Sequence, residues 1–276
     1  MDQHTARVGE YWLVLAALPG TDSQNIGVLL LDIGADRLHC RFRRDFEVFA
    51  DHETDWFREL PAYITQRAQE LGGQKCIAWL ESTLSHAVRI STPKRIPIAD
   101  RAAATVDELY LTHIRPKVLP YVTHLPQFSL EAAAGKFGKQ MSVEPEGWVE
   151  VPSEVPLLED MFVTHVRGHS MEPLIADNSL CAFRSPISGS WNGRVLLFEK
   201  YDEAGGNRYT VKVCRLSKAV DSDVAWLPQH IALESINPKY ESWEYETGDP
   251  SFAEKIRAVG EFLFMVRSPS RAVKSF

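Results

Sequence analysis

The stretch Val166-Arg167-Gly168-His169-Ser170-Met171-Glu172-Pro173 places a serine in a short turn. It is followed by the run Tyr209-Thr210-Val211-Lys212-Val213, in which Lys212 stands 42 residues after Ser170. A serine hydroxyl is a weak nucleophile at its own pKa, and a lysine activates it only where burial keeps the amine neutral. The valines beside Lys212 predict a buried strand, on which Thr210 and Lys212 share one face. The two stretches together indicate a serine–lysine catalytic pair, with Thr210 holding the amine.

Neither stretch is specific alone, because Gly-x-Ser-Met turns and isolated lysines are common in proteins without catalysis. The joint pattern resembles the peptidase domain shared by LexA, UmuD and phage CI-type repressors, where a Gly-x-Ser-Met-x-Pro turn carries the nucleophile and a Thr-Val-Lys strand carries the base. The resemblance spans about residues 128 to 267. Other segments that fall in the family's order are 174–180, 192–198, 231–240 and 258–266. The resemblance implies a mostly-β LexA-like peptidase domain and a homodimer.

The residues around Ser170 are expected to support the reaction. The oxyanion of a tetrahedral intermediate needs preorganised donors, and the amides of the turn from Gly168 to Ser170 are our candidates, with the Ser170 amide first. Met171 belongs to the same supporting turn. His169 stands where the family resemblance leads us to expect Asp or Asn. A side chain next to the nucleophile on a tight turn points away from it, so we expect His169 to be structural rather than a base.

The resemblance also implies a self-cleavage site. LexA-type proteins cut their own chain between a small residue and a glycine upstream of the nucleophile, and Ala134-Gly135 lies in that place, 36 residues before Ser170 when counted from Ala134. Glycine lets the backbone bend close to the serine. The apolar side chains flanking this bond, which suit a loop packed over the active site, are Phe128, Leu130, Phe137 and Met141. The competing interpretation is a short helical turn, since alanine has the highest helix propensity.

The amino-terminal part is predicted to be an α+β domain of unknown function over residues 1–115. Its strand-like runs, joined by short turns, are 11–18, 25–32 and 37–44, and its runs of helical spacing are 55–71 and 100–114. The Asn-Ile-Gly-Val strand faintly resembles a bacterial domain of unknown function, which names no activity.

A proline-punctuated linker is predicted over residues 116–141, followed by the peptidase domain over residues 142–276. The candidate cleavage bond lies in this linker. Cutting there would release the amino-terminal domain from the peptidase.

DNA binding is not expected, although the resembling repressors bind DNA. Residues 1–115 show no helix-turn-helix and hold 13 Lys or Arg against 16 Asp or Glu. The arginines 37, 41, 43 and 44 alternate with apolar residues, which is typical of the solvated face of a strand. A protein partner is the alternative ligand of this domain.

Composition suggests a cytoplasmic protein with two domains. The chain has 276 residues, 45% apolar content and a net charge of -7, without a secretion signal or a run long enough to span a membrane. The scattered Cys40, Cys76, Cys181 and Cys214 predict reduced core thiols, with a catalytic cysteine as the competing reading. No cofactor or metal is expected.

The sequence therefore predicts a self-cleaving serine endopeptidase, acting on its own loop in a bacterial stress or antiphage response. Neutral Lys212 would take the Ser170 proton, Ser170 would attack the carbonyl of Ala134, and water would resolve the acyl-enzyme. Three alternatives stay open. They are a dimeric partner-binding latch with slow cleavage, a repressor with an unfamiliar DNA-binding surface, and a peptidase that cuts another protein.

Overall fold

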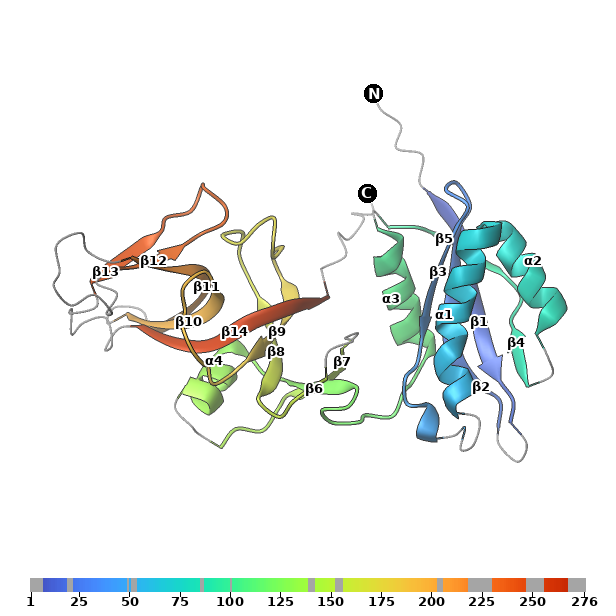
Figure 1. The fold of residues 1–276 in the computed structure, drawn as a ribbon, viewed down its shortest axis with the longest axis horizontal. Coiled ribbons are helices and arrows are strands. Elements are labelled where there is room, and N and C mark those ends of the chain that lie inside the picture. The colour runs from blue at the N-terminus through green and yellow to red at the C-terminus, as the bar shows by residue number, and fades with distance from the viewer. Residues whose placement is uncertain are drawn as a thin grey trace, which may run out of the picture. The chain divides into compact units, whose positions relative to one another are not determined.

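The computed structural model describes residues 7–18, 22–48, 50, 54–84, 87–99, 101–138, 142–151, 156–202, 206–217, 230–246 and 256–267. The chain divides into two compact units, and the boundary between them lies between Lys117 and Val118. The fold is mostly β, with one sheet in each unit (Figure 1). None of the helices in the described part of the chain is long and apolar enough to cross a membrane.

The first unit is built on an antiparallel sheet in the order β3-β2-β1-β4, with β5 also pairing with β1. The strands are β1 (Val8–Ala16), β2 (Gln24–Asp32), β3 (Arg37–Phe42), β4 (Val88–Ile90) and β5 (Lys94–Pro97). Both faces of the central strand β2 are covered, which is why its sequence is almost continuously apolar rather than alternating.

Helices cover the two faces of this sheet, α1 and α2 on one side and α3 on the other (Figure 1). Their bounds, with the 3-10 turn η1, are η1 (Phe46–Val48), α1 (Thr54–Leu71), α2 (Gly73–Thr83) and α3 (Ala102–His113). The predicted helices over 55–71 and 100–114 are thus present. Helix α2 was not predicted. Gly72, at φ 85°, ends α1 as expected, but α2 follows directly.

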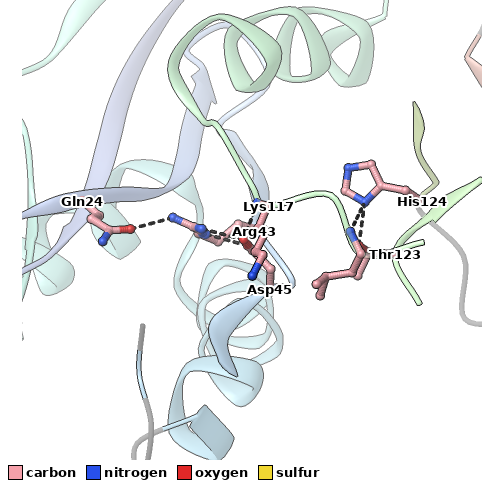
Figure 2. A network of polar contacts seen from close by, with 7 residues as sticks. Gln24, Arg43, Asp45, Lys117, Thr123 and His124 are labelled. Atoms are coloured by element: carbon pink, nitrogen blue, oxygen red, sulfur yellow. Dashed lines mark hydrogen bonds and ion pairs between the residues drawn. The ribbon is translucent and has the colours of Figure 1, made fainter. Parts of the chain in front are cut away.

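Arg43 departs from the expected solvated strand face. It is buried, and its guanidinium donates to both carboxylate oxygens of Asp45, at 2.7 and 2.6 Å (Figure 2). Gln24 accepts a third bond from Arg43, and the Lys117 amide donates to Asp45. Burial alone would raise the pKa of Asp45, but these donors hold that pKa below its ordinary value. Arg43 therefore belongs to an internal network that also anchors the end of the first unit.

The second unit contains a larger sheet in the order β13-β12-β11-β10-β14-β9-β8-β6-β7 among the described residues, antiparallel except for β6 beside β8. Its strands are β6 (His124–Gln127), β7 (Gly147–Glu150), β8 (Met161–Val166), β9 (Ser179–Arg184), β10 (Val195–Asp202), β11 (Gly206–Ser217), β12 (His230–Glu234), β13 (Trp243–Glu246) and β14 (Ile256–Arg267).

The stretch predicted as a linker contributes to this second unit. Strand β6 joins the sheet through β7 and β8, and it is followed by the short helix α4 (Leu130–Ala133) and the π-helical turn η3 (Ala134–Gly138). Phe128 and Ala134 are buried in the core of the unit. Pro126 lies in β6, whose backbone is extended, so this proline is compatible with the sheet, and burial of Phe128 and Ala134 joins the stretch to the core.

Candidate active site

Ser170 lies in the turn between β8 and β9. The turn begins at Gly168, whose φ of 100° favours glycine, and the Gly168 amide donates to the Asp177 carboxylate at 2.6 Å. Met171, which directly follows Ser170, is buried in the core of the second unit and anchors the turn there. Ser170 itself is half-buried and faces a pocket. The Gly168 amide is thus committed to Asp177 and is not the oxyanion donor. Among the described residues the Ser170 amide donates no hydrogen bond, so it remains our candidate.

Lys212 lies on β11, where it pairs with Leu196 of β10. Only 3% of its surface is exposed. Burial lowers the pKa of Lys212 below its ordinary value, and the charge of Glu241 opposes this shift in part. The flanking Val211 and Val213 point to the opposite face and pack in the core, as strand geometry requires. The local sequence therefore buries an amine in the way that general-base chemistry requires.

The amine of Lys212 is held by groups that the sequence analysis did not name. Its Nζ donates to the carbonyl oxygen of Glu241 at 2.8 Å and to Oγ of Ser235, and the Ser235 hydroxyl donates in turn to the Glu241 carbonyl at 3.2 Å. The indole of Trp243 covers the amine, with its ring centre 5.1 Å from Nζ. A neutral amine has two N–H bonds and one lone pair. Two acceptors satisfy those N–H bonds and leave the lone pair for a proton.

Ser170 and Lys212 face the same open pocket, which has a volume of about 450 Å³. The residues that line it are Gly168, His169, Ser170, Thr210, Lys212, Lys239, Tyr240, Glu241 and Trp243. The two predicted catalytic residues come from stretches far apart in the sequence, and both line this pocket.

The supporting residues lie only partly as expected. Thr210 lines the pocket, but the hydrogen bonds of Lys212 go to Ser235 and Glu241, so Thr210 is not the anchor of the amine. His169 is exposed, and its Nδ1 lies 2.9 Å from a carboxylate oxygen of Glu172, which raises the pKa of His169. An imidazole bound to a neighbouring carboxylate at the pocket rim is consistent with a structural role.

Asn237 connects the nucleophile turn to the segment that holds Lys212. Its backbone amide donates to the Ser170 carbonyl at 3.0 Å, and its side-chain amide donates to the His169 carbonyl at 2.9 Å. Ser235 and Asn237 belong to the segment 231–240 of the family resemblance, but their roles were not predicted from the sequence. Their place in that segment was the available signal, whereas the Glu241 carbonyl carries no side-chain signature.

The candidate cleavage bond does not lie in a loop. Ala134 has helical angles, φ -64° and ψ -38°, and is 1% exposed, and Gly135 continues the π-helical turn η3. Phe137 stacks on Phe162 of β8, with ring centres 4.3 Å apart. The competing interpretation, a short helical turn, is what the structure shows. The predicted flanking residue Met141 lies outside the described residues.

The four cysteines are free thiols, and three of them are buried. Burial raises the pKa of Cys181 to about 12 and that of Cys214 to about 11. Thiols with raised pKa values hold little thiolate, the form that acts as nucleophile. Burial therefore disfavours a cysteine as the nucleophile, and the described residues that line the pocket of Ser170 and Lys212 include none of the four.

Comparison with known proteins adds no family to this picture. No protein-family model and no curated protein matches the chain.

Proposed function

We propose that this protein is a serine peptidase in which Lys212 activates Ser170. The observation that carries the proposal is the Lys212 amine: it is buried, its N–H bonds have acceptors, and it shares a pocket with Ser170. The resemblance of residues 128–267 to the LexA, UmuD and CI peptidase domain supports the same assignment. The LexA-like arrangement of the second unit and a homodimer through it are part of this proposal.

The reaction begins with proton transfer. The lone pair of neutral Lys212 takes the proton of the Ser170 hydroxyl as Oγ bonds to the carbonyl carbon of the substrate, and the Ser170 amide stabilises the oxyanion. The Lys212 ammonium then gives that proton to the departing amine as the peptide C–N bond breaks. Lys212 next takes a proton from water as the water oxygen attacks the acyl carbon, and it returns that proton to Oγ of Ser170 as the ester C–O bond breaks.

The first candidate substrate is the protein's own Ala134-Gly135 bond. Ser170 can reach the Ala134 carbonyl only after α4 and η3 unwind, because the carbonyl must approach the hydroxyl to within bonding distance and Ala134 is buried in a helical turn. Cleavage would cut within the second unit, because β6 precedes the bond and pairs with β7 and β8. Release of the amino-terminal unit in a bacterial stress or antiphage response would therefore also require β6 to leave the sheet.

A second candidate is cleavage of another polypeptide, and the burial of Ala134 favours it. The folded chain hides its own bond while the Ser170 pocket stays open. A peptide from a partner would enter such a pocket without any rearrangement of α4.

The experiment is intact mass of the purified protein after incubation at neutral and alkaline pH, beside Ser170→Ala and Lys212→Ala. Fragments that join at Ala134-Gly135, more abundant at high pH and absent in both variants, support self-cleavage. Mixing Ser170→Ala with wild type separates the two candidates, because cleavage of the inactive chain requires action on another molecule. A chain that stays whole and cuts no added peptide would favour the partner-binding latch.

A further inference from the structure

The segment from Ser235 to Glu241 contacts both members of the proposed catalytic pair. Ser235 and the carbonyl of Glu241 accept the hydrogen bonds of Lys212, while Asn237 donates to the carbonyls of Ser170 and His169. We propose that Ser235 and Asn237 are positioning residues that hold the amine, the hydroxyl and the oxyanion donor in one reactive arrangement. The inference rests on the proposed function and assigns roles to residues of the same site.

The part of Ser235 is to direct the lone pair of Lys212. A lysine side chain has several rotatable bonds, so a buried amine needs fixed acceptors to point one way. Ser235 accepts from Nζ and itself donates to the Glu241 carbonyl, which also accepts from Nζ. These three hydrogen bonds use both N–H groups of the neutral Lys212 amine, so the lone pair of the amine points away from Ser235.

The part of Asn237 is to fix the peptide that carries the oxyanion donor. The peptide between His169 and Ser170 is planar and trans, so the Ser170 N–H points opposite to the His169 carbonyl. The side-chain amide of Asn237 binds that carbonyl at 2.9 Å, while its backbone amide binds the Ser170 carbonyl at 3.0 Å. Asn237 thereby sets the direction of the Ser170 amide from the opposite side of the turn.

Variants of the two residues are expected to differ in their effects, because Ser235 acts through Lys212 and Asn237 acts through Ser170. Other charged or titratable groups that line the pocket are His169, Lys239, Tyr240 and Glu241, and all are kept in the variants. Ser235→Ala removes an acceptor of the amine and leaves the nucleophile turn intact. Asn237→Ala removes the side-chain bonds to the His169 carbonyl and to the Lys239 amide, and it keeps the Ser235 hydroxyl and the Glu241 carbonyl as acceptors of Lys212.

The experiment combines two measurements on the full-length protein. The first is the pH titration of Lys212, followed by NMR on protein labelled with ¹³C at lysine Cε and assigned by the signal lost in Lys212→Gln. The second is the rate at which a fluorophosphonate modifies Ser170, followed by intact mass. Ser82→Ala is the matched control, since it removes a serine-to-carbonyl hydrogen bond, 2.9 Å long, in the first unit.

In Ser235→Ala we expect the Lys212 titration to move to lower pH, because the ammonium form loses an acceptor, and the Ser170 rate to fall by about 10²-fold. Ser235→Thr, which keeps the hydroxyl, should restore both. In Asn237→Ala we expect a similar loss of rate with the Lys212 titration unchanged.

Wild-type values of both measurements in Ser235→Ala and Asn237→Ala would overturn the inference while leaving the peptidase intact. If Ser170 is inert even in wild type, the proposed peptidase fails. The Lys212 titration then still tests Ser235, and a titration that does not move in Ser235→Ala removes its role as well.

Discussion

The Nζ of Lys212 lies 2.8 Å from the carbonyl oxygen of Glu241, so a main-chain atom shares in holding the proposed base. The side chain of Glu241 acts on the same amine in another way, because its negative charge favours the ammonium form and raises the pKa that burial lowers. One residue thus fixes the position of the amine and moderates its protonation.

Glu241→Gln is expected to shift the activity of the protein to lower pH. The substitution keeps the carbonyl but removes the charge that stabilises the ammonium, so the pKa of Lys212 falls further and the neutral base is present at lower pH. The pH dependence of Ser170 modification measures this shift. The same change at the exposed Glu59 of α1 should leave the profile in place. A profile that moves to higher pH in Glu241→Gln would contradict the assigned role of the charge.

Lys212→Met is expected to stabilise the protein at neutral pH by about 1 kcal/mol, because a buried amine is replaced by a hydrophobic side chain of similar length. The sign of the pH dependence follows from the lowered pKa of Lys212. Between this pKa and the ordinary value of 10.5, the unfolded chain holds a proton that the folded protein has released, so wild-type stability rises with pH.

Urea unfolding of wild type and Lys212→Met, from neutral pH through the alkaline range, measures both the gain in stability and its dependence on pH. The rise with pH should be smaller in Lys212→Met, and the exposed Lys75→Met on α2 should keep it. Loss of stability in Lys212→Met at neutral pH would show that the hydrogen bonds of the amine outweigh its burial cost.

Phe137→Ala is expected to accelerate self-cleavage and to destabilise the second unit by about 2 kcal/mol, which is less than for a fully buried phenylalanine because Phe137 is only half-buried. Its ring stacks on Phe162 and meets Phe128 edge-on, so its loss frees the turn η3 that contains Gly135. Intact mass against time measures cleavage. The double variant with Ser170→Ala must stay whole. Cleavage that is no faster in Phe137→Ala would favour action on another polypeptide.

Gly168→Ala is expected to cost about 1 to 3 kcal/mol through the backbone alone. A Cβ at this position would meet no atom within 4 Å, yet φ is 100°, which alanine adopts only with strain. Gly147→Ala is a matched control, because a Cβ there is equally unobstructed and its φ is not in the left-handed region. Thermal unfolding of the two variants compares them, and equal melting temperatures would mean that the turn relaxes at no cost.

The proposed catalytic pair was the part of the site that the sequence predicted most directly. Ser170 and Lys212 each stand in a short stretch of distinctive pattern, and the valines around Lys212 predicted the burial that the structure shows. The support of the amine was not accessible in the same way. Thr210 shares a strand face with Lys212, but the acceptors come from Ser235 and from a main-chain oxygen, both supplied by another segment.

In the fold, too, some elements follow from the local sequence and others depend on tertiary contacts. In the first unit, the strand runs 11–18, 25–32 and 37–44 and the helices over 55–71 and 100–114 follow from apolar spacing and correspond to β1, β2, β3, α1 and α3, whereas β4, β5 and α2 were not predicted. The segment around Ala134 was compatible with a loop or a helical turn. Burial of Ala134 and stacking of Phe137 on Phe162 are tertiary contacts that favour the helical form.

The most direct test of the central claim is the rate of Ser170 modification by a fluorophosphonate as a function of pH, in wild type, Lys212→Ala and Ser170→Ala. If Lys212 is the base, wild-type modification rises with pH as the amine loses its proton, falls by about 10² to 10⁴-fold in Lys212→Ala, and is absent in Ser170→Ala. An inert Ser170, or a rate that is the same with and without Lys212 at every pH, would contradict the account.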